Sequence, residues 1–408
     1  MQTRQLLLGA IDAALQAVNG RRCVHGFLQQ HPINGSVCVI AIGKAAAAMA
    51  QGAMDVLGEQ IHSGLVVTKR GQVDAEPEPA LTLRHLQAGH PFPDEASLEA
   101  GEALLTLLDR APTDATLLFL ISGGTSSLVE ILPHGLNLTD LNRVNQWLLA
   151  CGWDIHGINW LRKRLSCIKG GRLARYLNGR RTFNLMISDV PGNDPRIIGS
   201  GLLSADQTDA APPETLPDWV VELLGRVSPE PVPDESCFSN IQTHLVATPQ
   251  QAQQAALAYA RSQGQRAHGH ESLLTGEIHD VAKHIAGVLR HGQAEMHVWC
   301  GEPTVQLPDY PGRGGRNQSL ALAVALEIAG DDNIVFASVG TDGNDGATDD
   351  AGAMVDCTTS VQGNHEGLNA RAALKHADAG PFLEAAGALV STGSTGTNVM
   401  DLMLGWRG

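Results

Sequence analysis

Four short apolar segments of this chain are each followed by a loop that is rich in glycine and polar residues. Glycine lets the backbone turn its N–H groups toward a ligand, and Ser or Thr hydroxyls add further donors. Such loops predict a site that grips phosphate oxygens. The Asp and Arg residues within them indicate that the phosphate is transferred and not only held. The loops are 121–127 (ISGGTSS), 312–317 (GRGGRN), 340–346 (GTDGNDG) and 391–398 (STGSTGTN).

The apolar segments do not alternate with polar residues, which is typical of strands covered on both faces in a parallel sheet. The sequence therefore predicts an α/β fold with two α/β domains, the first Rossmann-like with a mainly parallel sheet. A ligand cleft is expected at the C-terminal strand ends or between the domains. Strands are predicted at 37–42, 64–68, 116–121, 183–187, 243–247, 296–300 and 333–339, and helices at 45–57, 98–108, 249–261, 278–289 and 318–328.

The length of 408 residues exceeds that of an ordinary single domain. Prolines are concentrated between Pro212 and Pro233 and would interrupt any regular helix or central strand there. We therefore predict a boundary near residue 235, with a first domain at 1–235 and a second at 236–408. The last strand, near 388–390, either stays in the second domain or returns to the first.

Charge and cysteine usage exclude several classes of protein. A net charge of −15 disfavours nucleic acid as a partner. The seven cysteines are odd in number and widely spaced, which predicts free thiols in the cytoplasm. No apolar run reaches the roughly 20 residues that a membrane span needs. The first residues indicate an amphipathic helix rather than a signal peptide, and the sequence leaves a homodimer open.

Lys44 and the 122–127 loop are the candidate phosphate-binding features of the first domain. Lys44 follows a predicted strand and opens a helix of small residues, so its ammonium would meet an anion at a helix N-terminus. Taken alone, it is more typical of a surface lysine. The loop predicts phosphate binding, with a capped strand-to-helix turn as the simpler alternative. Its candidate ligands are Gly123, Gly124, Ser126 and Ser127.

Further candidates follow later strands. Asp189 could orient or deprotonate a substrate hydroxyl, or ligate a metal, and an Asx-turn is the alternative interpretation. Arg316 lies where the predicted Leu/Ala helix begins, and a guanidinium beside free helix N–H groups is a good clamp for phosphoryl oxygens. Asp342 and Asp345 carry the hard oxygens that suit Mg²⁺. The remaining candidate ligands are Gly314, Gly315 and Asn398.

Taken together, these segments resemble the class II glycerate 2-kinases, a family whose C-terminal part is called the MOFRL domain. The resemblance spans nearly the whole chain. No single segment is decisive, but their order and joint presence are highly specific. The matching segments are 41–45 (AIGKA), 89–94 (GHPFPD), 121–128, 169–171 (KGG), 187–192 (ISDVPG), 301–305 (GEPTV), 312–318, 340–346 and 392–398.

The resemblance implies transfer of the γ-phosphoryl group of ATP to the 2-hydroxyl of D-glycerate, with Mg²⁺, in a cleft between two α/β domains. The family's important lysine and arginine match Lys44 and Arg316, which we expect to neutralise the phosphoryl oxygens from opposite sides as the cleft closes.

Two alternatives stay open. One is an NAD(P)H-dependent hydroxypyruvate reductase, the label that some relatives carry. The segment 199–204, however, ends in serine and is no G-x-G-x-x-G fingerprint. The other is a non-catalytic protein that binds sugar phosphates, which would not require so many carboxylates.

Overall fold

The structure is a computed structural model that describes residues 2–71, 83–206, 215–228 and 230–408. The chain forms two compact units, one of residues Gly20–Val246 and the other of Met1–Asn19 together with Ala247–Gly408. Three of the prolines on which the predicted boundary depends, Pro212, Pro213 and Pro229, lie outside the described residues.

The apolar segments of the first unit form neighbouring strands of one sheet. Its order is that of a doubly wound dinucleotide-binding fold, in which ligands bind where the strand order reverses, here between β1 and β4. The pairs from β3 to β5 are parallel, and β1, β4 and β5 are buried throughout. The Rossmann-like prediction is therefore confirmed. The strands in sheet order are β3 (Leu83–Ala88), β2 (Ile61–Lys69), β1 (Val37–Ile42), β4 (Thr116–Ile121), β5 (Thr182–Ile187) and β6 (Ile241–Ala247).

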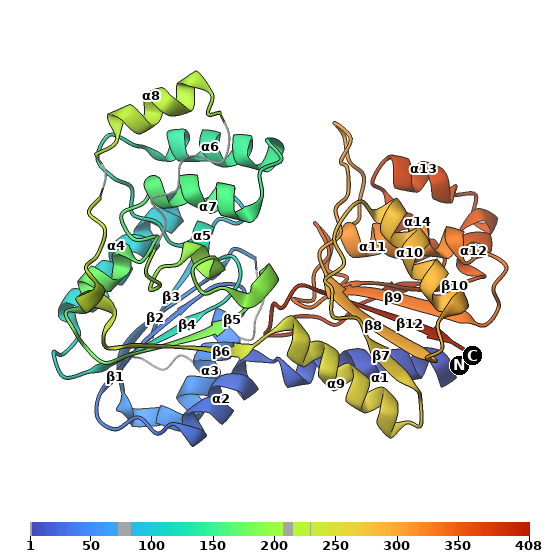
Figure 1. Ribbon diagram of the computed structural model, residues 1–408, viewed down its shortest axis with the longest axis horizontal. Helices are drawn as coiled ribbons and strands as arrows, with labels where there is room; N and C mark the ends of the chain where they lie inside the picture. Colours follow the sequence, from blue (N-terminus) through green and yellow to red (C-terminus); the bar gives the residue numbers. More distant parts are fainter. Residues whose placement is uncertain (1, 72–82, 207–214, 229) are drawn as a thin grey trace. The chain divides into compact units, whose positions relative to one another are not determined.

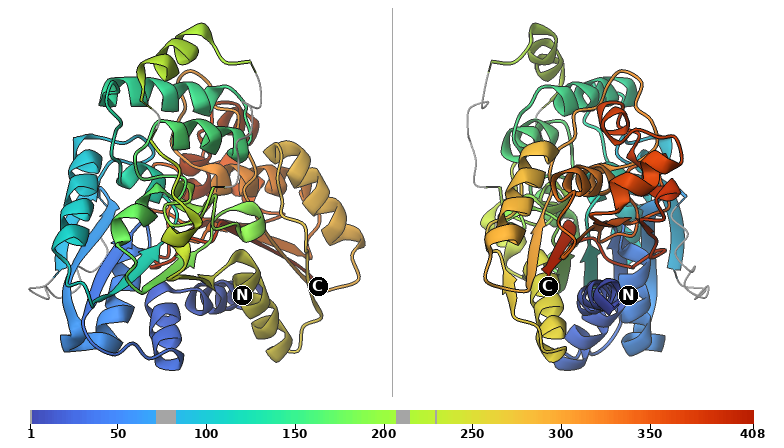
Figure 2. Two further views of the ribbon diagram at one scale, coloured as in Figure 1. Left: turned by 60° about the vertical axis from the view of Figure 1, so that its left-hand side comes forward. Right: turned by 90° about the vertical axis from the view of Figure 1, so that its right-hand side faces the viewer.

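Helices cover both faces of this sheet (Figure 1). Helices α2 (Gly20–Gln30) and α3 (Ala46–Leu57) lie on one face, and α4 (Glu95–Arg110) lies on the other. The small residues of α3 permit close packing, since a Cβ on Gly52 would lie 2.3 Å from the carbonyl oxygen of Arg21 in α2. A separate apolar cluster joins the helices at one end of the unit (Figure 2), namely α6 (Leu138–Ala150), α7 (Ile155–Arg164) and α8 (Asp218–Arg226).

The second unit contains a mixed sheet whose central strand is the last of the chain. Strand β12 runs antiparallel to both of its neighbours, β8 and β9, whereas β7 and β8 are parallel. This sheet is therefore not mainly parallel like the first, because the last strand of the chain inserts between β8 and β9 and runs antiparallel to both. Both β11 and β12 pair within this sheet, so the chain end does not return to the first. The order is β11 (Leu389–Val390), β10 (Gly352–Asp356), β9 (Ile334–Gly340), β12 (Asp401–Arg407), β8 (Met296–Gly301) and β7 (Ala267–Gly269).

Helix α1 (Gln2–Ala17) belongs to this second unit although it begins the chain. It packs against α9 (Pro249–Ser262), and a Cβ on Gly9 would lie 2.1 Å from the hydroxyl oxygen of Tyr259. The first domain predicted from the sequence, 1–235, includes these residues. The division differs because the apolar face of α1 is covered by the second unit.

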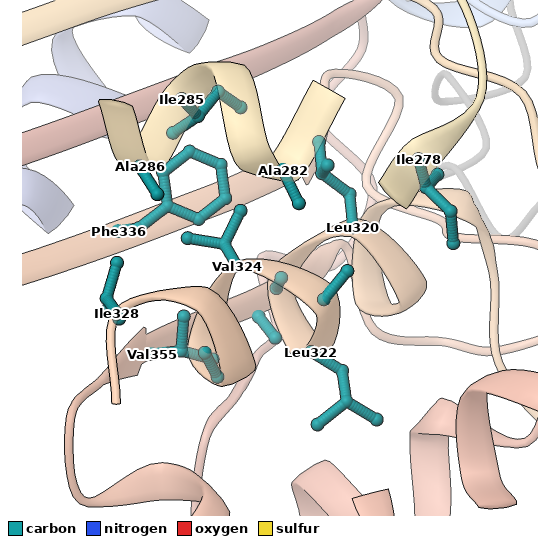
Figure 3. Packing of buried hydrophobic residues seen from close by; sticks show 14 of the residues in the cluster. Ile278, Ala282, Ile285, Ala286, Leu320, Leu322, Val324, Ile328, Phe336 and Val355 are labelled. Atoms are coloured by element: carbon teal, nitrogen blue, oxygen red, sulfur yellow. The ribbon is translucent and has the colours of Figure 1, made fainter. Parts of the chain in front are cut away.

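The second unit is organised around the buried helix α11 (Arg316–Glu327), which lies between α10 (Ile278–His291) and strands β9 and β10 (Figure 3). Asn317 to Ala325 are all buried, so this helix belongs to the core of the unit. Helices α12 (Thr359–His365), α13 (Ala370–Lys375) and α14 (Ala379–Ala385) complete this layer. The packing holds the start of α11, and therefore Arg316, at a defined place beside the sheet.

Histidines gather at the β7 edge of the same sheet. His270 Nε2 lies 3.0 Å from His297 Nδ1, and the His270 ring stacks on Trp299 with a centroid distance of 4.5 Å. Burial, followed by the charges of His297, His268 and His284, lowers the pKa of His270 to about 4. The folded chain therefore keeps this imidazole neutral at a pH where an unfolded chain would protonate it.

We predict that His270 contributes a loss of unfolding free energy to this unit as the pH drops from 6.5 toward about 4, because only the unfolded chain takes up a proton at His270 there. The buried Asp345 and Asp401, whose pKa values are raised, act in the opposite direction, so the test compares variants and not the wild type alone. The difference in unfolding free energy between the wild type and His270→Asn should change over this range, and the difference between the wild type and His291→Asn, at the exposed end of α10, should not. Urea unfolding at several pH values checks this. Parallel pH dependences of His270→Asn and the wild type would contradict it.

Candidate active site

The first sheet brings the candidate residues of its unit to one edge. Residues 43–44, 122–127 and 188–189 follow β1, β4 and β5, which are parallel neighbours. Because parallel strands end at the same edge, these segments lie side by side, and we call them the strand-end site. Lys44 and Asp189 are both half-buried there.

Two loops of the strand-end site are joined by hydrogen bonds. The Lys44 N–H donates to the carbonyl oxygen of Gly123 at 2.9 Å, and the Ala45 N–H donates to Ser122 Oγ at 3.0 Å. Gly43 has a φ of 129°, and a Cβ there would lie 2.2 Å from Ser122 Oγ. Glycine at this position therefore permits the contact that places Lys44 beside the 122–127 loop.

The hydroxyls of this loop bond to other protein groups. Thr125 Oγ1 donates to the last carbonyl of β1 at 2.8 Å, and Ser127 Oγ donates to a carbonyl of its own loop at 3.1 Å. Ser126 Oγ lies 2.8 Å from Ser200 Oγ. We expected the hydroxyls to contact phosphate, but here they stabilise the loop. The predicted binding role of Gly123, Gly124, Ser126 and Ser127 therefore rests mainly on their backbone N–H groups.

In the second unit, Arg316 lies between two carboxylates, and we call Arg316, Glu302 and Asp401 the arginine cluster. Arg316 Nη2 donates to Glu302 Oε1 at 2.9 Å and to Asp401 Oδ1 at 3.1 Å. Arg316 Nε lies 2.5 Å from Asp401 Oδ2. Arg316 is the first residue of α11, Glu302 follows β8 and Asp401 begins β12, so each comes from a different element.

The arginine cluster has strongly shifted pKa values. Burial raises the pKa of Asp401 to about 7, with Arg316 opposing the shift and Glu302 adding to it. Burial alone would lower the pKa of Arg316, but Asp401 and Glu302 outweigh it and raise that pKa. The guanidinium is therefore always charged, and the ionised form of the buried Asp401 depends on that cation.

Neither carboxylate of this cluster is among the site residues predicted from the sequence. Glu302 lies in the segment 301–305 that contributes to the family resemblance, which was the available signal. Asp401 precedes a short apolar run and carries no motif of its own. Its role depends on the pairing of β12 with β8 and β9, and the local sequence does not predict this pairing.

Asp345 caps the buried helix α11. Its Oδ1 accepts the Asn317 N–H at 2.9 Å and its Oδ2 accepts the Gln318 N–H at 2.7 Å. Burial raises the pKa of Asp345 to about 6, although these hydrogen bonds oppose the shift. The helix N–H groups that we expected beside Arg316 as ligand donors are therefore occupied by a protein carboxylate.

The capping role uses both oxygens of Asp345 as acceptors of backbone hydrogen bonds, and the predicted role of Asp345 as a magnesium ligand stays a prediction. In the part of the chain that the structure describes, no three His, Cys, Asp or Glu side chains are grouped to hold a metal ion. Asp342 is half-buried and its Oδ1 accepts the Asn344 N–H at 3.2 Å. Its role as a magnesium ligand stays a prediction.

The three glycine-rich loops of the second unit meet at this end of the sheet. A Cβ on Gly343 would lie 2.1 Å from the carbonyl oxygen of Gly393, and one on Gly346 would lie 2.5 Å from that of Gly314. Asn398 is buried, and a Cβ on Gly315 would lie 2.2 Å from Asp345 Oδ1. Glycine is needed at these positions for loop packing, and ligand binding by Gly314, Gly315 and Asn398 stays a prediction.

Comparison with known proteins gives matches along the whole chain. Two family models match, "Domain of unknown function (DUF4147)" at residues 6–218 and "MOFRL family" at residues 295–401. The D-glycerate 2-kinase of Thermotoga maritima is 33% identical over 98% of both chains. A putative hydroxypyruvate reductase of Agrobacterium vitis is 35% identical over 98% of this chain and 94% of its own. The crystal structure of glycerate kinase from Thermotoga maritima is similar with a TM-score of 0.85 and 32% identity, covering 100% of both chains.

We predict that Asp345→Asn lowers the unfolding free energy of the second unit by about 1–3 kcal/mol, because an amide NH₂ would face one of the two helix N–H donors. Asp349→Asn, an exposed change in the same region, is the matched control and should have little effect. Urea unfolding in EDTA measures both. Unchanged stability in EDTA together with a lost stabilisation by Mg²⁺ would instead make Asp345 a metal ligand.

Proposed function

We infer that this chain, which belongs to the glycerate 2-kinase family with DUF4147 and MOFRL regions, transfers the γ-phosphoryl group of ATP to the 2-hydroxyl of D-glycerate. The products are 2-phosphoglycerate and ADP. The observation that carries the inference is the extent of the similarity to a D-glycerate 2-kinase, which runs through both units. It therefore includes both the strand-end site and the arginine cluster.

The reductase alternative has less support. It comes from the label of the Agrobacterium relatives, and the first sheet does have a dinucleotide-type strand order. However, the turn after β1, where the phosphate-binding fingerprint of such folds belongs, reads GKAAAA at 43–48. A lysine followed by alanines lacks the glycines that let a pyrophosphate approach the backbone. The relatives reported above are named as kinases or reductases, and none of these names supports a non-catalytic protein that binds sugar phosphates.

The proposed chemistry is positioning and charge neutralisation. The bond between the γ-phosphorus and ADP breaks as a bond forms to the glycerate 2-oxygen, whose proton leaves. We propose that Lys44 and Arg316 each stabilise negative charge on the transferring group. Asp189 would orient the attacking hydroxyl or accept its proton. The 122–127 backbone would bind either nucleotide phosphates or the glycerate carboxylate.

We propose that Mg²⁺ binds together with ATP. Magnesium sites in such enzymes use substrate phosphates, waters and only one or two carboxylates, so a dedicated protein cage is not required. Of the two predicted ligands, Asp342 fits this role better than Asp345, whose oxygens cap α11. Bound Mg²⁺ would reduce the charge on the nucleotide phosphates.

We propose D-glycerate and ATP as the small-molecule partners of this chain. Within the described ranges, no helix has the length and apolar character needed to cross a membrane. All seven cysteines are free thiols, which supports our proposal of a cytoplasmic location. We also propose a homodimer, which light scattering on the purified chain can test.

We predict ADP release that requires D-glycerate, because the hydroxyl acceptor must be present for productive transfer. A coupled ADP assay measures the rate, and ³¹P NMR of the product identifies the phosphorylated hydroxyl. A parallel reaction with hydroxypyruvate and NADH should show no oxidation of the nicotinamide. Nicotinamide oxidation without ADP release would establish the reductase instead.

We predict that Lys44→Ala and Arg316→Ala each lower kcat by at least about 100-fold, as expected for removal of one donor to a developing negative charge. Lys283→Ala and Arg266→Ala are matched controls, because both side chains are exposed and ion-paired elsewhere. Since Arg316→Ala leaves the buried Asp401 without its cation, Arg316→Lys is a second variant that retains a charge. Wild-type turnover in a folded double variant would contradict both roles.

A further inference from the structure

The two carboxylates that contact Arg316 differ greatly in accessibility. The Asp401 side chain is 4% exposed and the Glu302 side chain is 45% exposed. Asp401 approaches both Nε and Nη2 of Arg316, whereas Glu302 contacts Nη2 alone. The guanidinium therefore has one buried partner that holds two of its nitrogens and one exposed partner that shares a single nitrogen.

Asp401 is held in place by the sheet. It is the first residue of β12 and pairs in register with Gly301 of β8 and Gly340 of β9. A buried carboxylate that loses its only cation is strongly destabilised, because it has no water to replace the interaction. Asp401 and Arg316 are therefore expected to stay paired throughout a reaction cycle.

Glu302 is held much less firmly. An exposed ion pair with one contact contributes little, because water and salt compete for both groups and the side chain loses entropy. Glu302 also follows the end of β8 rather than lying within it. An incoming anion with a higher charge can displace such a carboxylate without unfolding any element.

We propose that Glu302 is a displaceable counter-ion, occupying the position at Arg316 Nη2 that an anionic oxygen of the substrate takes, and that Asp401 is the positioning residue that keeps the guanidinium in place. The occupant would be an oxyanion of a phosphoryl or carboxylate group. A dianion competes effectively with one carboxylate, whereas chloride does not. Glu302 thus makes Arg316 selective for dianions over chloride. The proposal rests on the proposed function only through the role of Arg316.

The two carboxylates then have opposite effects on anion binding. Glu302→Gln removes the competing charge and keeps the shape of the side chain, so it should strengthen binding. Asp401→Asn removes the charge that orients the guanidinium, so it should weaken binding and lower kcat. A purely structural role for both residues would instead shift both variants in the same direction.

Inorganic sulfate is the probe, titrated into the full chain at constant ionic strength with chloride as the balancing anion. Thermal shift gives the apparent Kd, and kinetics give inhibition against each substrate. Glu302→Gln should lower the apparent Kd for sulfate about two- to five-fold, the change that corresponds to an exposed ion pair. Asp401→Asn should raise it, and Arg316→Ala should abolish the sulfate effect.

Glu99→Gln is the matched control, because Glu99 pairs with the exposed Arg84 of the first unit and the variant makes the same change of net charge. It should leave sulfate binding unchanged. Equal gains in Glu99→Gln and Glu302→Gln, or weaker binding in Glu302→Gln, would overturn the proposal. Sulfate binding needs neither ATP nor glycerate. An absence of kinase activity with the expected sulfate pattern would therefore contradict the proposed function and leave this inference intact.

Discussion

The second unit depends on hydrogen-bond acceptors for the first N–H groups of a helix that is buried along most of its length. Helix α11 is buried from Asn317 onward, so the N–H groups of its first turn need protein acceptors. Asp345 supplies both oxygens from a loop that follows β9. The first helical residue, Arg316, extends to the first residue of β12. One short segment thus joins the core helix to the central strand and places the candidate catalytic guanidinium.

The two units place their candidate cations by the same means. Lys44 lies just before helix α3 and Arg316 begins helix α11, and in both cases an adjacent glycine allows another loop to approach closely. The electrostatic surroundings differ. The strand-end site contains one carboxylate, Asp189, together with neutral hydroxyls and carbonyls, whereas the arginine cluster holds two carboxylates. The glycines that suggested phosphate loops serve loop packing in both units.

The sequence predicted strands best where both faces are buried. Strands β1 and β4 have the predicted bounds, because a strand covered on both sides appears as an uninterrupted apolar run. Strand β12 was missed because Gly405 interrupts it. A Cβ there would lie 2.6 Å from Leu289 Cδ2 in α10, so tertiary packing selects glycine in a central strand. The roles of Asp345 and Asp401 depend on partners distant in sequence, so no local pattern could predict these roles.

The anion site proposed at Arg316 would have to act in a chain with a net charge of −15. Distant carboxylates matter little, since salt screens exposed charges beyond about 8–10 Å. Within the cluster, one guanidinium faces two carboxylates, so the resting cluster is itself negative while Asp401 is ionised. Asp401 is buried and holds the guanidinium, whereas Glu302 is exposed and shares a single nitrogen. Displacement of Glu302, as proposed above, would therefore expose positive charge on Arg316 while Asp401 keeps the guanidinium in place. An anion bound there would take the position of the exposed partner and leave the buried ion pair intact.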